Sequence, residues 1–105
     1  PTGSTAYNLA AGGPIVHPEA EVILMTPISA HSLTSRPLVF PSGIGLRIEN
    51  EENSAHPHVS ADGRDAFAEC PEFPLEIFVS EKTFPLIETS GHSHFRVLRN
   101  KLKWG

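Results

Sequence analysis

A chain of 105 residues with 39% hydrophobic and 19% charged residues has the composition of one globular domain or of a piece of one. The formal net charge of −4 disfavours nucleic acids and anionic membrane surfaces as partners, because binding to either normally requires an excess of basic residues. No apolar run approaches the roughly 20 residues that cross a bilayer, and the single cysteine, Cys70, excludes an internal disulfide and fits a cytoplasmic protein.

The first expected element is a short helix near the start of the chain, with the hydroxyl of Thr2 or Ser4 as its N-cap. Gly12 is free to adopt a positive φ and Pro14 cannot continue a helix, so the helix should end just before them. The residues between that favour a helix are Ala6, Leu9, Ala10 and Ala11.

Ten prolines and eight glycines separate short apolar runs over the rest of the chain, which indicates a mostly β fold with many turns. The expected strands are residues 20–26, 38–40, 44–49 and 75–79, with 83–87 as a further candidate. In 44–49, Ile44, Leu46 and Ile48 alternate with other residues at the period of two that marks a half-buried strand.

Two further elements have local signals. Asp62-Gly63 suits a tight turn with positive φ, so residues 58–61 and 64–69 are expected to form a β-hairpin. Phe95, Leu98 and Leu102 recur at helical spacing with basic residues near the end, which predicts a terminal helix over residues 93–103.

Four blocks of the sequence resemble NAD kinases and occur in the order in which that family has them. The first is Thr2-Gly3-Ser4-Thr5-Ala6-Tyr7 followed by Ala11-Gly12-Gly13-Pro14-Ile15. The second is Leu24-Met25-Thr26-Pro27-Ile28 with His31-Ser32-Leu33 and Arg36-Pro37-Leu38-Val39. The last two are Val59-Ser60-Ala61-Asp62-Gly63-Arg64 and Leu98-Arg99-Asn100-Lys101-Leu102-Lys103-Trp104. One short block would be weak evidence, but four in order cover nearly the whole chain.

The resemblance implies that residues 1–105 are part of the C-terminal, β-sandwich-like, NAD-binding domain of an NAD kinase, with the last helix packing back on an N-terminal domain. It implies transfer of a phosphoryl group from ATP to the 2′-hydroxyl of the adenosine ribose of NAD, giving NADP, with a divalent cation such as Mg²⁺. A homo-oligomer, either a dimer or a tetramer, is also implied. The implied NAD contacts are Thr2, Gly3, Ser4, Thr5, Ala6 and Tyr7.

The chemistry of this first block agrees with such a role but is too weak to bind a nucleotide by itself. A helix N-terminus attracts phosphate or ribose oxygens, and Tyr7 offers a flat ring for a base. The helix dipole supplies only about 0.3–1 kcal/mol at an exposed site, whereas micromolar binding requires about 8 kcal/mol. Other surfaces must therefore contribute, and a capped helix without a ligand is the alternative that spacing alone favours.

Three other residues are candidates for NAD contacts, each with a structural alternative. Asp62 and Arg64 flank the expected hairpin turn, and the resemblance places this turn near the dinucleotide, in the same subunit or a neighbouring one. His31 lies in a loop that the resemblance places on the adenosine side, but it also suits a polar turn. Arg36 is better explained as a structural partner than as a phosphate clamp.

No metal site and no nucleophile are expected. His56 with His58, and His92 with His94, form His-x-His pairs, but a closed zinc site needs about four ligands, usually including thiolates. We therefore expect solvated or locally bonded histidines. Cys70 has no fixed basic neighbour that would activate it.

The catalytic base is expected on a part of the protein that lies before this chain, which starts inside a motif and without an initiator Met. In the family, the base is the Asp of a Gly-Gly-Asp-Gly motif, and that motif does not occur here. No catalytic residue is therefore assigned, and residues 1–105 alone are expected to be inactive.

Two alternatives stay open: a β-rich oligomerisation module without a ligand, and a related lipid or sugar kinase. Ala10 and Ala61 depart from residues common in the family, so the sequence leaves the choice between NAD and NADH open.

Overall fold

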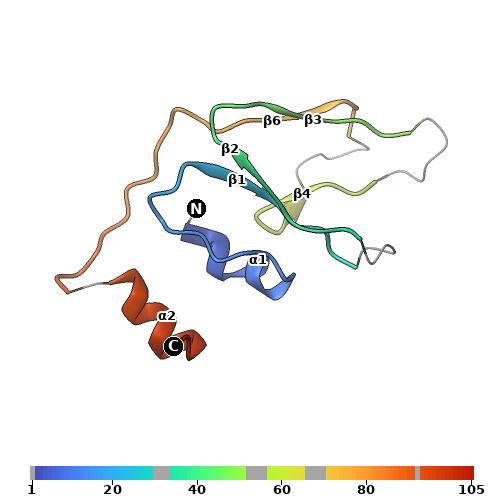
Figure 1. Ribbon diagram of the computed structural model, residues 1–105. Coiled ribbons are helices and arrows are strands. Elements are labelled where there is room, and N and C mark those ends of the chain that lie inside the picture. Colours follow the sequence, from blue (N-terminus) through green and yellow to red (C-terminus); the bar gives the residue numbers. More distant parts are fainter. Residues whose placement is uncertain (1, 30–33, 52–56, 66–70, 92) are drawn as a thin grey trace. The chain divides into compact units, whose positions relative to one another are not determined.

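The computed structural model describes residues 2–29, 34–51, 57–65, 71–91 and 93–105 (Figure 1). The chain divides into two compact units, one formed by Pro1–Ser42 with Ser80–Gly105 and the other by Gly43–Val79. Within the described residues, six strands and two short α-helices form, which confirms the mostly β fold. None of the described helices has the length and apolar character needed to cross a membrane.

The first unit begins with a 3-10 helix, η1 (Thr2–Thr5), followed by the single-turn helix α1 (Tyr7–Ala10). The expected helix is therefore present in two parts, and Gly12 ends it with a φ of 83° as predicted. The N-cap assignment was wrong for α1, because its N-cap is Ala6 and no side chain caps it. The hydroxyl of Ser4 is instead bonded to the backbone of Val16.

A two-stranded antiparallel sheet follows, made of β1 (Val22–Met25) and β2 (Leu38–Pro41). Val22 pairs with Pro41 and Met25 with Leu38. Both strands were predicted, and β1 is shorter than expected at each end. Pro41 is tolerated because it ends β2 on a sheet whose outer edge needs no further donor.

No strand forms over residues 83–87, so that prediction was wrong. The segment is extended and exposed, and Phe84 and Ile87 are 85% and 99% accessible to solvent. An apolar run forms a strand only when a neighbouring edge accepts its hydrogen bonds, and Pro85 also removes one donor. In this stretch the apolar run therefore leaves hydrophobic side chains at the surface and forms no strand.

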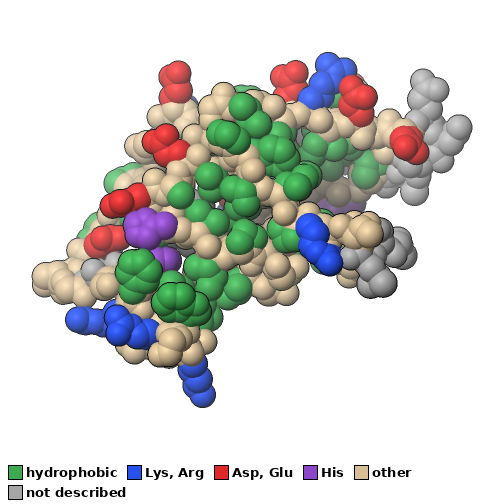
Figure 2. Space-filling view, viewed as in Figure 1, with side chains coloured by type: hydrophobic (Ala, Val, Ile, Leu, Met, Phe, Trp, Pro, Cys, Tyr) green, Lys and Arg blue, Asp and Glu red, His purple; other side chains and the backbone are tan. Residues whose placement is uncertain are grey.

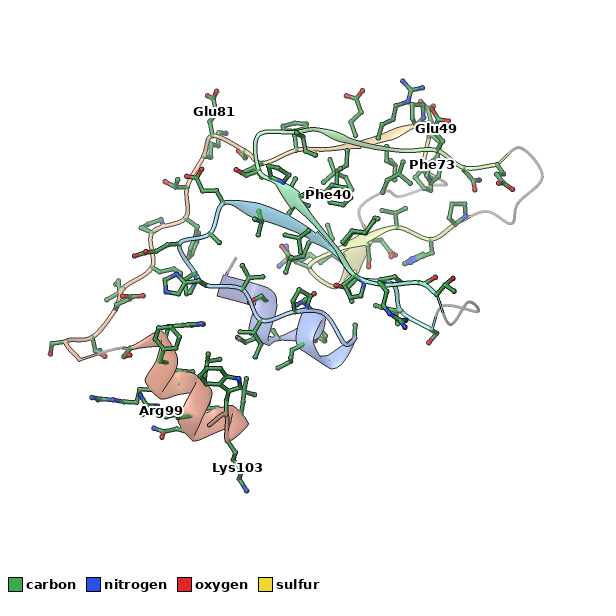
Figure 3. The ribbon with its side chains drawn as sticks, viewed as in Figure 1. Phe40, Glu49, Phe73, Glu81, Arg99 and Lys103 are labelled. Carbon is green, nitrogen blue, oxygen red and sulfur yellow. The ribbon has the colours of Figure 1, made fainter. Side chains whose placement is uncertain are left out.

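The terminal helix α2 (His94–Leu102) confirms the helical spacing seen in the sequence. Its last turn carries Arg99 and Lys101, where positive charge favours a helix C-terminus. Lys103 ends it with a left-handed backbone conformation. Figure 3 shows Arg99 and Lys103 extending away from the helix, whereas Leu98, on the inward side, is only 4% exposed.

The second unit contains two antiparallel pairs. β3 (Leu46–Ile48) pairs with β6 (Leu75–Ile77), and β4 (Ser60–Ala61) pairs with β5 (Arg64–Asp65). The hairpin turn is the predicted one, since Asp62 and Gly63 have φ values of 50° and 72°. The remainder of its expected second arm, residues 66–69, lies outside the described residues.

The described residues bury little apolar surface. Leu98, at 4% exposure, is the one buried hydrophobic side chain among them, and the three sheets have two strands each. Figure 2 shows hydrophobic side chains at the surface over much of the face in view. The packing of these sheets into a sandwich therefore stays a prediction.

Candidate functional site

The candidate site is the turn formed by η1, Ala6 and Tyr7, because it contains six contiguous residues of the first sequence block. Its outer side is open: Gly3 has no other atom within 4 Å of the position that a Cβ would take. Ala6 is exposed, Thr5 is half-buried and the Tyr7 ring is 91% accessible. The side chain of Thr2 is not among those described. The turn thus presents backbone and an aromatic ring to solvent.

The turn is held together by its own backbone and by a partner residue further along the chain. The Ala6 N–H donates to the Gly3 carbonyl at 3.0 Å. The Ser4 side chain is 3% exposed, and its hydroxyl accepts from the Val16 N–H at 3.1 Å and donates to the Val16 carbonyl at 3.2 Å. Ser4 therefore faces inward, so its hydroxyl supports the turn from behind.

The short length of α1 corrects the physical picture behind the first block. The helix spans four residues, too few for aligned peptide dipoles to sum to a substantial charge. Any ligand contact at this turn would therefore depend on shape and on individual polar groups. The open backbone at Gly3 and the exposed ring of Tyr7 supply these features.

A side chain that the sequence did not single out lies at the centre of this region. The Asn8 amide donates to the Ser4 carbonyl at 2.9 Å and to the Pro14 carbonyl at 2.8 Å. Its carbonyl oxygen accepts from the Thr26 hydroxyl at 2.6 Å. Asn8 therefore joins η1, the loop after α1 and the residue that follows β1.

Gly13 lies directly against this side chain. A Cβ at Gly13 would lie 2.0 Å from Asn8 Oδ1 and 2.7 Å from the Thr26 hydroxyl oxygen, so only glycine fits. Its N–H also donates to the Asn8 backbone carbonyl at 2.8 Å. The Gly-Gly pair thus has two separate requirements, a positive φ at Gly12 and close approach at Gly13.

The remaining predicted site residues lie elsewhere. Asp62 and Arg64 belong to the β4–β5 hairpin of the second unit, and both are exposed. The Oδ1 atom of Asp65, next to them, lies 2.6 Å from the His58 Nε2. His31 lies outside the described residues. The structure therefore places Thr2 to Tyr7 in one turn of the first unit. Asp62 and Arg64 lie on a hairpin of the second unit.

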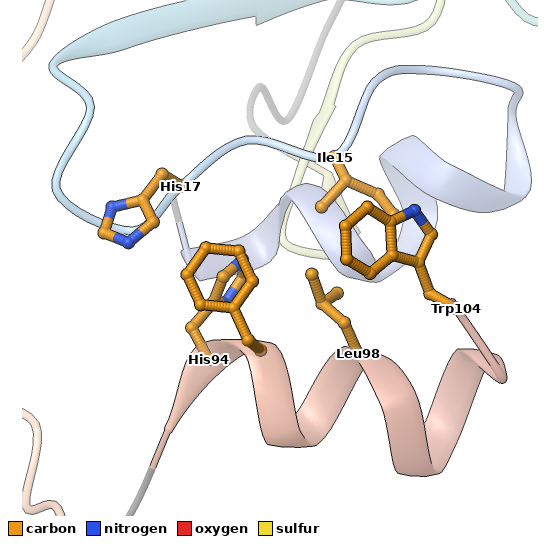
Figure 4. Close-up of a pocket in the computed structure, with 6 residues that line it drawn as sticks. Ile15, His17, His94, Leu98 and Trp104 are labelled. Atoms are coloured by element: carbon orange, nitrogen blue, oxygen red, sulfur yellow. The ribbon is translucent and has the colours of Figure 1, made fainter.

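Helix α2 and the loop after α1 enclose a hollow of about 290 Å³ in the first unit (Figure 4). The rings of His17 and His94 meet edge to face at 5.3 Å, and Phe95 packs on both. The His17 Nδ1 also accepts from the Glu19 N–H at 3.3 Å. Of the histidines in the two His-x-His pairs, His94 makes these ring contacts and His58 contacts Asp65, whereas His56 and His92 lie outside the described residues. The residues that line the hollow are Ile15, His17, His94, Phe95, Leu98 and Trp104.

The described part of the chain holds no group of three or more His, Cys, Asp or Glu side chains that could bind a metal ion. The contact of Arg47 with Glu49 and that of His58 with Asp65 both lie on the exposed surface. Such pairs contribute little to stability, about 0–1 kcal/mol. The side-chain hydrogen bonds of Ser4 and Asn8, by contrast, join separate segments of the chain.

The family follows from comparison with known proteins. The model of the ATP-NAD kinase C-terminal domain matches residues 1–89, and the chain belongs to this family. It is 48% identical over 105 residues to the NAD kinase of Syntrophobacter fumaroxidans, covering 100% of this chain and 37% of that protein.

Two other relatives match this chain with similar identity and coverage. The NAD kinase of Bdellovibrio bacteriovorus is 43% identical over 107 residues, with 100% of this chain and 35% of that protein covered. The NAD kinase of Wolinella succinogenes is 42% identical over 105 residues, with 100% and 36% covered. The chain thus spans just over a third of the length of these relatives.

Proposed function

We propose that this chain is the NAD-binding part of an NAD kinase, which transfers a phosphoryl group from ATP to NAD and forms NADP. Membership of the ATP-NAD kinase C-terminal domain family and the names of the relatives support the proposal. Because the chain spans just over a third of those relatives, the proposal concerns a longer enzyme that contains it.

The observation that carries the proposal is the open outer face of the η1 turn. Gly3 leaves the backbone uncovered, and the Tyr7 ring is almost fully accessible. An aromatic ring of this size gains free energy when a flat ligand covers it. A dinucleotide has both a flat base and polar ribose oxygens, so it matches a surface that combines a ring with free backbone. We assign NAD contacts to Thr2, Gly3, Ser4, Thr5, Ala6 and Tyr7.

His31, Asp62 and Arg64 complete the proposed NAD-binding set. Asp62 lies in the two-residue turn and Arg64 directly follows it, and both are exposed, which leaves both side chains able to reach a ligand. Their opposite charges suit different parts of a dinucleotide, since a guanidinium binds phosphate and a carboxylate accepts from ribose hydroxyls.

In the proposed reaction, the 2′-hydroxyl oxygen of the adenosine ribose attacks the γ-phosphorus of ATP. The bond from that phosphorus to the β-phosphate oxygen breaks, and a base takes the hydroxyl proton. We assign binding and orientation of NAD to this chain. The described residues offer no cluster of ligands for a divalent cation, so we assign ATP, its cation and the base to the rest of the enzyme.

A substitution at Gly3 tests this assignment without disturbing the fold. Nothing lies within 4 Å of a Cβ at Gly3, so Gly3→Val should fold and block the approach of a ligand. In the complete enzyme, we expect the Kd for NAD to rise at least about tenfold, which corresponds to about 1.4 kcal/mol. Isothermal titration calorimetry measures the Kd, and chromatography of NADP measures turnover.

Gly43→Val is the matched control, because a Cβ there also meets no atom within 4 Å. It should leave both the Kd and turnover of the complete enzyme unchanged. Unchanged NAD binding in Gly3→Val would contradict the assignment of the turn, and an unsubstituted complete enzyme that makes no NADP would contradict the proposed function.

Exposed apolar side chains support a second role, in assembly. Phe84, Leu86 and Ile87 are all exposed on one extended segment, and Phe95 and Trp104 are about half exposed on or next to α2. Such patches mark surfaces that another body covers. We propose that α2 packs on the N-terminal part of the enzyme and that the enzyme is a homo-oligomer. Analytical ultracentrifugation of the complete enzyme distinguishes a monomer from a dimer or tetramer.

A further inference from the structure

We propose that Asn8 is a positioning residue for NAD, acting through a clamp that consists of Asn8, Thr26 and Gly13. The proposal rests on the proposed function, in which the η1 turn binds NAD. It assigns the precise placement of that turn to one side chain, which contacts Ser4, Pro14 and Thr26 at once.

The hydrogen bonds fix the Asn8 amide in one orientation. Its two N–H groups point at two carbonyl oxygens, which can only accept, and its oxygen points at a hydroxyl. Turning the amide over would place its oxygen against both carbonyls and leave two acceptors without a donor. Three of the four hydrogen bonds that an asparagine amide can make are thus used in a single arrangement.

Packing removes the remaining freedom of the clamp. Gly13 is buried, and the space where its side chain would be is filled by Asn8 Oδ1 and the Thr26 hydroxyl. The Asn8 side chain therefore has backbone on one side and a hydroxyl on the other. A side chain at Gly13 would therefore have to displace Asn8 or Thr26.

The clamp connects the turn to the most regular part of the first unit. Thr26 follows β1 directly, and β1 is paired with β2 from Val22 to Met25. Within the turn, Asn8 bonds to the Ser4 carbonyl, and Asn8 directly follows Tyr7 in the chain. The exposed atoms at Gly3 and Tyr7 are thus held at a set distance from the sheet. Binding groups need placement to within about 0.5 Å for full effect, so loss of the clamp should weaken NAD binding selectively.

Thr26→Val tests the clamp in the complete enzyme, because valine keeps the shape of threonine and removes the hydroxyl that Asn8 accepts from. We expect the KM for NAD to rise roughly fivefold to tenfold, a smaller loss than the hundredfold that a 1 Å displacement can cause. The KM for ATP should change less than twofold. Thr26→Ser keeps the hydroxyl, so its KM for NAD should equal that of the unsubstituted enzyme. Thr83→Val, on an exposed segment, is the matched control.

Asn8→Asp provides a second, independent variant. It keeps the oxygen that accepts from Thr26 but loses both donors, so it should raise the KM for NAD in the same selective way. The positioning role would be overturned if the KM values for NAD and ATP changed equally, or if neither changed. It would also be overturned if Thr26→Val, Asn8→Asp and Thr26→Ser all failed to fold. An unsubstituted enzyme without NAD kinase activity would instead contradict the proposed function, so the two failures are distinguishable.

Discussion

At the scale of single residues, the six positions of the first block divide by the direction in which they face. Gly3, Ala6 and Tyr7 are exposed, whereas Ser4 is buried and bonded to both backbone groups of Val16. A run of hydroxyl residues in sequence therefore does not present a row of hydroxyls to a ligand. For Ser4, the side chain maintains the shape of the turn, and a contact with NAD stays a prediction.

Ser4→Ala should destabilise the complete enzyme by about 1–3 kcal/mol, because the partly buried N–H and carbonyl of Val16 lose their partner. The midpoint of urea unfolding, followed by circular dichroism, measures the loss. Ser90→Ala, at an exposed position, is the control and should change stability by less than about 0.5 kcal/mol. Equal stability of the two variants would contradict the supporting role of Ser4.

At the scale of elements, the clearest case is the β4–β5 hairpin. Its two-residue turn has positive φ at both Asp62 and Gly63, the geometry that matches the twist of the adjoining strands. The turn sets the register in which Ser60 pairs with Asp65. It therefore also fixes the backbone at the proposed contacts, Asp62 and Arg64. The hairpin is thus a local element whose shape is encoded by two residues.

Gly63→Ala should destabilise this hairpin by about 1–2 kcal/mol, because its φ of 72° is costly for any residue with a Cβ. Asp62→Asn should be neutral, since asparagine adopts the left-handed conformation readily. Hydrogen–deuterium exchange of the amides of residues 60–65 measures the opening of the hairpin. Faster exchange in Asp62→Asn than in Gly63→Ala would refute this explanation of the turn.

Prediction from sequence succeeded where the signal was local. The hairpin depends on Asp62-Gly63 and α2 on the spacing of Phe95, Leu98 and Leu102, so neighbours in sequence determine them. It failed for residues 83–87, because a strand also needs a partner edge that no local pattern reveals. The central role of Asn8 could not be predicted either, since its acceptors and donor come from three separate segments of the chain.

At the scale of the whole molecule, the chain has many apolar side chains and little core. Only one hydrophobic side chain is buried in the described part, while Phe78, Phe84 and Ile87 stay mostly exposed. Stability of a domain rests mainly on apolar burial, which has to exceed a large conformational entropy. We therefore expect residues 1–105 to depend on further surfaces, either the rest of the enzyme or another copy.

Residues 1–105 expressed alone should form no NADP from NAD and ATP, because no catalytic base is assigned to them. Their exposed apolar side chains should also increase the fluorescence of the dye ANS well above that of the complete enzyme, since this dye binds accessible apolar surface. Chromatography of the reaction mixture and dye fluorescence measure the two effects. NADP formation by residues 1–105 would show that the base lies within this chain.

The hollow between α2 and the loop after α1 also bears on the order in which the molecule forms. His17 and His94 meet there, although the whole second unit lies between them in sequence. Contacts so distant along the chain close late in folding, after local turns and hairpins have formed. During synthesis, Ile15 and His17 therefore lack these contacts until α2 has left the ribosome, and apolar surface left exposed in this way favours aggregation.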